Sequence, residues 1–143
     1  MKKRLIALCM AACLALSLCS CASVEGNPLP VGMDAPEVLE AGSQIVPDLN
    51  EGDWQAVYDL LREDAKQQNA SPDAIRDHMN AVLEKVGPFK SVEQSMATGQ
   101  KLKDSGEEYA TAVFYCKHEK NQAMYRIAFS TDMELIGLQI TEQ

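Results

Sequence analysis

Few side chains in this sequence stand in patterns that could support acid–base, nucleophilic or metal chemistry. The 143 residues contain only two histidines, His78 and His118, with no patterned carboxylates between them. Because a zinc site needs three or four ligands at short, regular spacings, we predict no metal site. Phosphate-cradling glycine loops, nucleophile elbows and zinc-protease motifs are also absent from the sequence. We therefore predict no catalytic residues, no cofactor and no bound metal.

Three side chains that could do chemistry in other settings have structural interpretations here. His118 falls in a charged segment between two expected strands, which favours a solvated turn residue. His78 flanks the apolar stripe of an expected helix and is interpreted as a boundary residue. Cys116 lies in an apolar strand, where a free cysteine usually behaves as a small buried hydrophobe. The alternative for Cys116 is a reactive or intermolecular thiol.

One face of the expected sheet is the remaining candidate for binding chemistry. Successive side chains of a strand alternate between faces, so if Tyr125, Ile127 and Phe129 pack under helices, their neighbours point the other way. That opposite face carries the ligand-binding candidates Arg126, Tyr115, Gln139 and Met124. An arginine surrounded by aromatic, thioether and amide groups could bind an anionic small molecule or a peptide. The alternative is an exposed strand face with a solvated arginine.

The elements that would position these residues form the C-terminal third of the chain. Period-2 alternation predicts strands at Tyr109–Lys117, Ala123–Ser130 and Leu135–Thr141. The connections between them are too short for a crossover helix, which predicts an antiparallel meander. A fourth strand is predicted at Phe89–Lys103, with Gly99 marking a bulge or bend.

Two amphipathic helices are predicted before the sheet. The first runs from about Glu51 to Gln68, with Asn50 as its N-cap. The second begins with Ser71 as its cap and Pro72 in its first turn, and it ends at Gly87. Residues 48–143 are therefore predicted to be one α+β domain, with two N-terminal helices packed on a curled antiparallel sheet of about four strands.

Residues 21–47 are predicted to form a tether rather than part of this domain. Four of the six prolines and three of the eight glycines of the chain fall between Ala22 and Pro47. Such a linker could hold the domain at most about 80 Å from its attachment point, at about 3.3 Å per residue. Its apolar pairs Val38–Leu39 and Ile45–Val46 are expected at most to dock on the domain as a short strand.

The N-terminus has the features of a secretory signal. Basic residues at positions 2–4 precede an apolar run from Leu5 to Leu18. This run ends in Leu18-Cys19-Ser20-Cys21, which resembles the lipobox of bacterial lipoproteins. We predict a signal peptide at residues 1–20 and a lipid on Cys21 that anchors the protein outside the bacterial cell membrane. The alternative of a plain membrane anchor helix is disfavoured, because the apolar run is shorter than about 20 residues.

Removal of the leader makes the chain more acidic. The leader holds three of the 13 basic residues and none of the 21 acidic ones, which leaves 10 basic against 21 acidic residues and a net charge of −11. Nucleic acids and anionic headgroups attract clustered Lys and Arg, so this charge excludes nucleic acid as a partner. Contact with the membrane is expected through the lipid on Cys21.

Several segments of the chain together are similar to a known family. They are Leu49–Leu61, Val86-Gly87-Pro88-Phe89-Lys90, Tyr125–Phe129 and Ile136-Gly137-Leu138. This combination resembles the domain-of-unknown-function 3887 family of small secreted or lipid-anchored bacterial domains. The resemblance implies a fold like nuclear transport factor 2 within the cystatin-like class, a curled sheet wrapped round helices to make a cone. It transfers no catalytic residues, and it admits a homodimer because such curled sheets often pair face to face.

Two classes of function are compatible with these features. The first is a binding or interaction module for a small molecule, peptide or protein partner outside the membrane. The alternative is a small cone-fold enzyme of the isomerase or dehydratase kind, with a pocket carboxylate as general base. Asp59 is the only carboxylate we can name for that role, and its spacing from Val57 predicts that it faces solvent. We favour the binding module.

Overall fold

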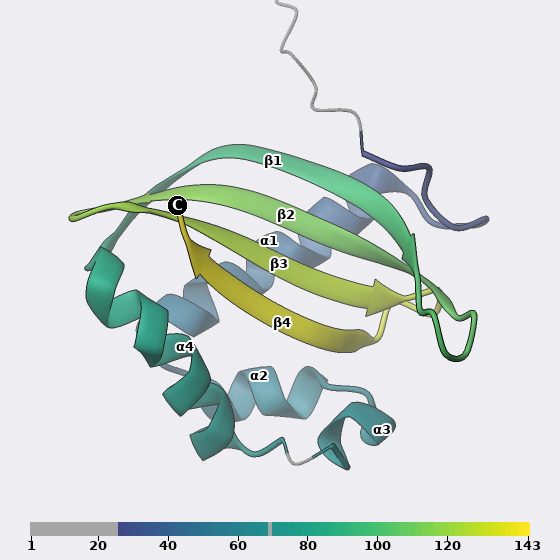
Figure 1. Cartoon of the computed structure of the whole chain (residues 1–143), viewed down its shortest axis with the longest axis horizontal. Coiled ribbons are helices and arrows are strands. Elements are labelled where there is room, and N and C mark those ends of the chain that lie inside the picture. Colours follow the sequence, from purple (N-terminus) through teal and green to yellow (C-terminus); the bar gives the residue numbers. More distant parts are fainter. Residues whose placement is uncertain (1–25, 69) are drawn as a thin grey trace, which may run out of the picture.

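The computed structural model describes residues 26–68 and 70–143, in which four helices precede a four-stranded antiparallel sheet (Figure 1). The helices are α1 (Ala35–Glu51), α2 (Trp54–Leu60), α3 (Glu63–Lys66) and α4 (Pro72–Val86), and the strands are β1 (Phe89–Lys101), β2 (Glu108–His118), β3 (Gln122–Ser130) and β4 (Leu135–Glu142). The strands follow one another in space in the order β1-β2-β3-β4. The predicted α+β fold and the antiparallel meander are confirmed.

The strand register places the side chains of the sheet as the alternation predicted. Tyr125 of β3 lies between Phe114 of β2 and Ile140 of β4, and all three are buried. The prediction of a bulge at Gly99 was wrong. The register shifts of β1 occur near its start, between Phe89 and Ser91 and again between Val92 and Gln94. Gly99 instead pairs in regular register with Ala110.

The main departure from the sequence prediction is α1, which occupies much of the segment expected to be a tether. Its buried residues are Val38, Gly42, Ile45, Val46 and Leu49, which recur at helical spacing along one face. Burying four aliphatic side chains contributes about 1.5–3 kcal/mol each. The helix loses about 3 kcal/mol of stability through Pro47 in its interior and about 1 kcal/mol through Gly42. The free energy gained by burial exceeds the sum of these two costs. Packing on the sheet therefore makes a helix from a proline-containing segment.

Gly42 allows α1 to lie close against the sheet. A Cβ atom added to this glycine would stand 2.8 Å from the Cβ of Ala112 and 2.8 Å from Cε2 of Phe114. Both neighbours are buried on β2, so they have little room to move. A residue without a side chain is therefore needed at the crossing of α1 and β2.

The predicted helix from Glu51 to Gln68 was wrong in its extent. Gly52, in the left-handed conformation with φ 77°, ends α1, and Asp53 caps α2 by accepting a hydrogen bond from the N–H of Ala56 at 3.1 Å. The N–H of Arg62 then donates to the carbonyl of Leu135 at 2.8 Å, which interrupts the helical path between α2 and α3. Asn50, predicted to be an N-cap, lies near the end of α1 instead.

The last helix agrees with its sequence signals. Ser71 caps α4 by accepting a hydrogen bond from the N–H of Ala74 at 3.0 Å, and Pro72 occupies the first turn. Ile75, Met79 and Val86 are buried along one face of the helix. The stop at Gly87 is confirmed as well, because this residue has φ 79° and its N–H donates to the carbonyl of Leu83.

The segment before α1 is also part of the domain. The N–H of Gly99 on β1 donates to the carbonyl of Asn27 at 3.1 Å, and the N–H of Asn27 donates to Oγ1 of Thr98 at 3.0 Å. A Cβ atom on Gly99 would stand 1.9 Å from the carbonyl oxygen of Pro28, so only glycine permits this approach. The predicted boundary at residue 48 is therefore corrected, since the domain includes residues from 27 onwards.

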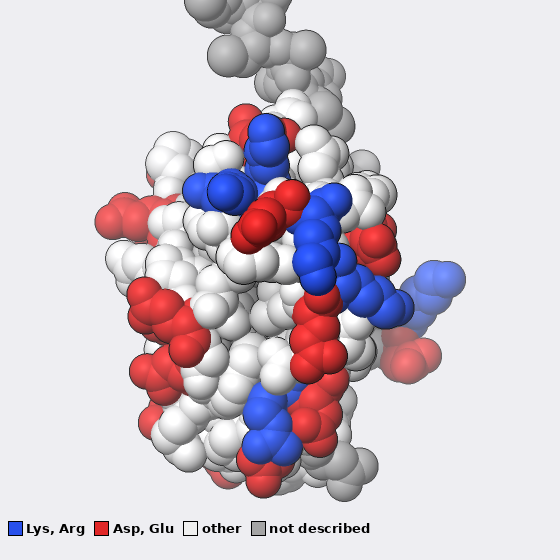
Figure 2. All heavy atoms as spheres, turned by 90° about the vertical axis from the view of Figure 1, so that its left-hand side faces the viewer, with Lys and Arg blue, Asp and Glu red and all other residues white. Residues whose placement is uncertain are grey.

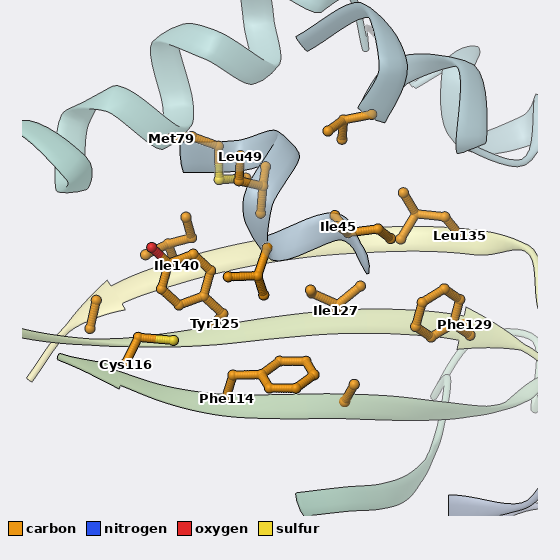
Figure 3. Packing of buried hydrophobic residues seen from close by; sticks show 14 of the residues in the cluster. Ile45, Leu49, Met79, Phe114, Cys116, Tyr125, Ile127, Phe129, Leu135 and Ile140 are labelled. Atoms are coloured by element: carbon orange, nitrogen blue, oxygen red, sulfur yellow. The ribbon is translucent and has the colours of Figure 1, made fainter. Parts of the chain in front are cut away.

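The core lies between the helices and one face of the curved sheet. Leu49 of α1 and Met79 of α4 point towards the sheet, where Tyr125 and Ile140 point back at them (Figure 3). Figure 1 shows all the helices on this side, so the opposite face of the sheet is left without a helical cover. Among the described residues, no helix has the length and apolar character required to span a membrane.

Candidate functional site

A chain of buried and partly buried hydrogen bonds connects the core to the surface of the domain. His118 was predicted to be a solvated turn residue, and this prediction was wrong, because it is the last residue of β2 and only 2% exposed. Its Nδ1 lies 2.7 Å from the carbonyl oxygen of Gly87, and its Nε2 lies 2.8 Å from the hydroxyl of Tyr125. The histidine thus joins the end of α4 to β3.

The donors and acceptors of this chain can be assigned from their chemistry. A carbonyl oxygen can only accept, so Nδ1 of His118 carries a proton, and in the neutral ring Nε2 accepts from the hydroxyl of Tyr125. The amide nitrogen of Asn50 donates to that hydroxyl oxygen at 3.1 Å and to the carbonyl of Val46 at 2.9 Å. We call Gly87, His118, Tyr125 and Asn50 the polar chain. It connects α1, the α4–β1 junction, β2 and β3.

A cleft of about 520 Å³ opens above the Asn50 end of the polar chain. It lies among the C-terminal ends of α1 and α4, the start of β1 and the hairpin between β2 and β3. Its apolar walls include Trp54, Leu83 and Phe89, and its polar lining includes Asn50, Asn80, Glu84 and Lys120. The cleft therefore combines aromatic surface, two amides and charges of both signs.

The charges near this cleft belong to a wider distribution on the same end of the molecule. Figure 2 views the end that carries the β2–β3 hairpin and shows Lys and Arg gathered in its upper part, with Asp and Glu predominating elsewhere. The protein as a whole is acidic, with a net charge of −8 for the full sequence. A ligand with both a positive and a negative group would meet opposite charges at Glu84 and Lys120.

Burial keeps the thiol of Cys116 and the hydroxyl of Tyr125, a member of the polar chain, in their neutral forms. Cys116 is 1% exposed, and burial raises the pKa of its thiol to about 12, with a further contribution from the charge of Glu93. Burial likewise raises the pKa of Tyr125 well above its ordinary value. The expectation that Cys116 is a small buried hydrophobe is confirmed by its burial.

We expect Cys116 to resist alkylation in the folded protein. Raising its pKa from 9.0 to about 12 lowers the thiolate fraction near pH 8 roughly a thousandfold. The unfolded thiol ionises first as pH rises, so this group stabilises the fold fully below about pH 9 and loses that effect as pH rises towards 12. Peptide-resolved mass spectrometry after iodoacetamide treatment would measure the protection. Rapid native labelling of Cys116 would contradict it.

The sequence-predicted ligand-binding candidates lie on the sheet face that the helices leave uncovered. Arg126 pairs across the strands with Gln139, and Tyr115 pairs with Met124, so the register brings these four residues into adjacent positions. Arg126 is exposed and the other candidates are exposed or half-buried. The cleft at Asn50 is on the helix side of the sheet and contains none of them.

The other titratable candidates have local partners or exposed positions. Asp59 is exposed on α2 and accepts a hydrogen bond from Nε2 of Gln55 at 2.8 Å. His78 is exposed and lines an apolar groove of about 330 Å³ between α4 and β4. The described residues contain no group of three or more His, Cys, Asp or Glu side chains placed to hold a metal ion.

A second cleft, of about 480 Å³, has its charges already paired. Arg62 donates through both Nε and Nη2 to Asp64, and it also donates to both carboxylate oxygens of Glu107. These hydrogen bonds hold the pKa of each carboxyl below its ordinary value and raise that of the guanidinium. The cluster joins α3 to the segment before β2, which is a structural role.

Comparison with protein families assigns the chain to a group without an established activity. Residues 42–138 match the family model described as "Protein of unknown function (DUF3887)". The chain belongs to the DUF3887 family. This confirms the resemblance inferred from the sequence motifs, and the matched segment begins within α1 and includes the whole polar chain. A search of curated proteins finds no match to the chain.

A solved structure shares the fold. The NMR structure of a protein from Ruminococcus gnavus ATCC 29149 is similar with a TM-score of 0.64 and 23% sequence identity. The similarity covers 79% of this chain and 96% of that protein. At this level of identity the comparison supports the α+β architecture with helices on a curled sheet and says nothing about activity.

Proposed function

We propose that the protein is a lipid-anchored extracytoplasmic binding module whose ligand occupies the cleft beside Asn50. The observation that carries this proposal is the way Asn50 is held. Its side chain lines the cleft, while the Val46 carbonyl and the Tyr125 hydroxyl bind its amide nitrogen from behind. A polar group that is fixed before the ligand arrives loses little conformational entropy on binding.

The composition of the cleft indicates the kind of ligand. Its volume of about 520 Å³ falls within the usual range for small-molecule sites, which combine apolar walls with a few placed polar groups. Trp54 and Phe89 offer surface to an apolar part. The amide oxygen of Asn50 offers an acceptor, because both of its N–H groups are already used, and the amide of Asn80 offers donors and an acceptor. Glu84 and Lys120 favour a molecule with both charges. A zwitterionic small molecule or a short peptide meets these requirements.

The membrane anchor is supported by the sequence. The signal peptide and Cys21 lie outside the described residues, so the lipobox-like pattern Leu18-Cys19-Ser20-Cys21 carries this part of the proposal. Lipid on Cys21 would place the domain outside the cell membrane, where small molecules and peptides pass before uptake or sensing. The enzyme alternative gains no support from Asp59, which lies on an exposed helix face.

The fluorescence of Trp54 gives a direct test, because it is the only tryptophan in the chain and it lines the cleft. We expect a panel of zwitterionic amino-acid derivatives and dipeptides, titrated into the full-length protein, to contain members that change this fluorescence saturably. Lys120→Ala should weaken such binding roughly ten- to a hundredfold, because a hydrogen bond to a charged group contributes about 1.5–3 kcal/mol. Asn80→Ala should weaken it by a similar or smaller factor.

Arg126→Ala is the matched control, since it removes a cationic side chain from the opposite face of the sheet. We expect this variant to bind the same probes with unchanged affinity. If Arg126→Ala abolishes binding while Lys120→Ala does not, the ligand occupies the uncovered sheet face instead of the cleft. If no zwitterionic probe binds to the wild-type protein, the proposed ligand class is wrong.

A further inference from the structure

The chain between the proposed lipid and the folded domain is short. Asn27 is already hydrogen bonded to β1 through Thr98 and Gly99, and Pro30 just after it is buried. Only six residue steps therefore separate Cys21 from the first docked residue. At about 3.3–3.6 Å per residue this length spans at most about 20 Å, against about 80 Å for the tether expected from the sequence.

A link of this length restrains the orientation of the domain. The helix α1 alone, with 17 residues, is about 25 Å long at 1.5 Å per residue. The headgroup region of one leaflet takes up several ångströms of the available reach. The domain is therefore larger than the span of its link, and the surface next to Asn27 stays near the bilayer.

The surface beside Asn27 presents an apolar side chain to its surroundings. The N–H of Met33 donates to the carbonyl of Pro30 at 3.1 Å, which closes a turn with Val31 and Gly32 at its tip. Gly32 has φ 87°, as the third position of a type II turn requires. Val31 is 98% exposed, which is more than any other large hydrophobic side chain in the described part of the chain.

We propose that the turn at Pro30–Met33 is the membrane-facing surface of the anchored domain and that Val31 contacts the lipid interface. This inference depends on the proposed lipidation of Cys21. Because the mature chain is net acidic, we expect the short link and the apolar side chain of Val31, rather than attraction to anionic headgroups, to keep this turn at the membrane. The turn lies just before α1, and the cleft at Asn50 lies near the other end of this helix, about 22 Å along its axis from Ala35.

A site-placed tryptophan tests this orientation. In a Trp54→Phe background, Val31→Trp puts the single indole on the turn. Leu60→Trp puts it on α2, where Leu60 is 51% exposed and lies beside the middle of α1. The lipidated full chain is reconstituted in phosphatidylcholine vesicles that contain brominated acyl chains. We expect severalfold stronger quenching of the indole at position 31 than at position 60. Equal quenching at both positions, or none at either, would overturn the proposal.

A second variant separates docking from lipidation. Gly99→Val adds a side chain where the carbonyl of Pro28 now lies, so it should release the segment from β1 and lengthen the link. Quenching at position 31 should then fall while the circular dichroism spectrum is retained. Gly137→Ala is the control, because its added Cβ atom would make only an ordinary contact at 3.7 Å with Ala128. Unchanged quenching in Gly99→Val would contradict the role of the docked segment.

The mass of the N-terminal peptide and flotation with vesicles show which proposal has failed. A chain that lacks lipid on Cys21 and does not float contradicts the anchored binding module itself. A chain that carries the lipid and floats, yet shows no preferential quenching at position 31, contradicts only the orientation. Cys21→Ser supplies the reference for both measurements, because it removes the thiol that would carry the lipid.

Discussion

Replacing Gly42 with valine is expected to destabilise the domain by about 2–3 kcal/mol, because it overfills the contact between α1 and the sheet. The added Cβ atom alone would stand 2.8 Å from Ala112 and from the ring of Phe114, closer than side chains pack without movement. Both neighbours belong to the buried core, so the strain must be relieved by shifting α1. Urea unfolding followed by Trp54 fluorescence would measure the loss.

Gln44→Val is the matched control for this prediction. Gln44 is exposed two positions further along the same helix, so valine there adds the lower helix propensity of a β-branched residue without any new contact in the core. We expect it to cost less than about 1 kcal/mol. If the two variants lose the same stability, the close approach of α1 to β2 is not important for the fold.

Replacing Tyr125 with phenylalanine should destabilise the protein by about 1–3 kcal/mol through the polar chain. The substitution keeps the ring in the core and removes only the hydroxyl between His118 and Asn50. Nε2 of His118 would then be buried without a partner, which costs the desolvation of that nitrogen. Because Asn50 would lose one of its two fixed contacts, we also expect weaker binding of cleft ligands.

A double-mutant cycle with His118→Leu shows whether this loss comes from the hydrogen bond. With the imidazole gone, the Tyr125→Phe change leaves no unsatisfied ring nitrogen and should cost less than it does in the wild-type protein. Denaturant midpoints for the four proteins give the coupling energy. A cost for Tyr125→Phe that is independent of residue 118 would mean that the two side chains are not coupled.

The parts of the fold that the sequence predicted correctly have signals contained in short stretches of chain. Two caps define α4: Ser71, followed by Pro72, begins the helix and Gly87 ends it. Each cap acts on backbone groups that lie only a few residues away in the sequence. The alternation in Tyr125–Phe129 defines β3 in the same way, since neighbouring side chains of a strand must lie on opposite faces. Such signals need no knowledge of the rest of the chain.

The errors concern elements whose stability comes from distant partners. The α1 segment contains prolines and glycines that are typical of linkers. It becomes helical because Val38, Ile45, Val46 and Leu49 are buried against the sheet, whose first strand begins only at Phe89. Gly99 was interpreted as marking a bulge or bend, whereas its lack of a side chain admits the backbone of Pro28. In both cases the deciding contact joins segments far apart in the sequence.

The sequence by itself determined the family, the α+β class, the meander, the last helix and the expectation of a lipid on Cys21. Only the tertiary structure decided that residues 35–51 form a helix, that Asn27 is docked on β1, and that His118 is buried between Gly87 and Tyr125. The cleft beside Asn50 belongs to this second group, because its lining comes from four separate parts of the chain. Local sequence patterns indicate which face of a helix or strand is apolar. A polar site depends on the distances between several elements, and these distances are set only by the folded structure.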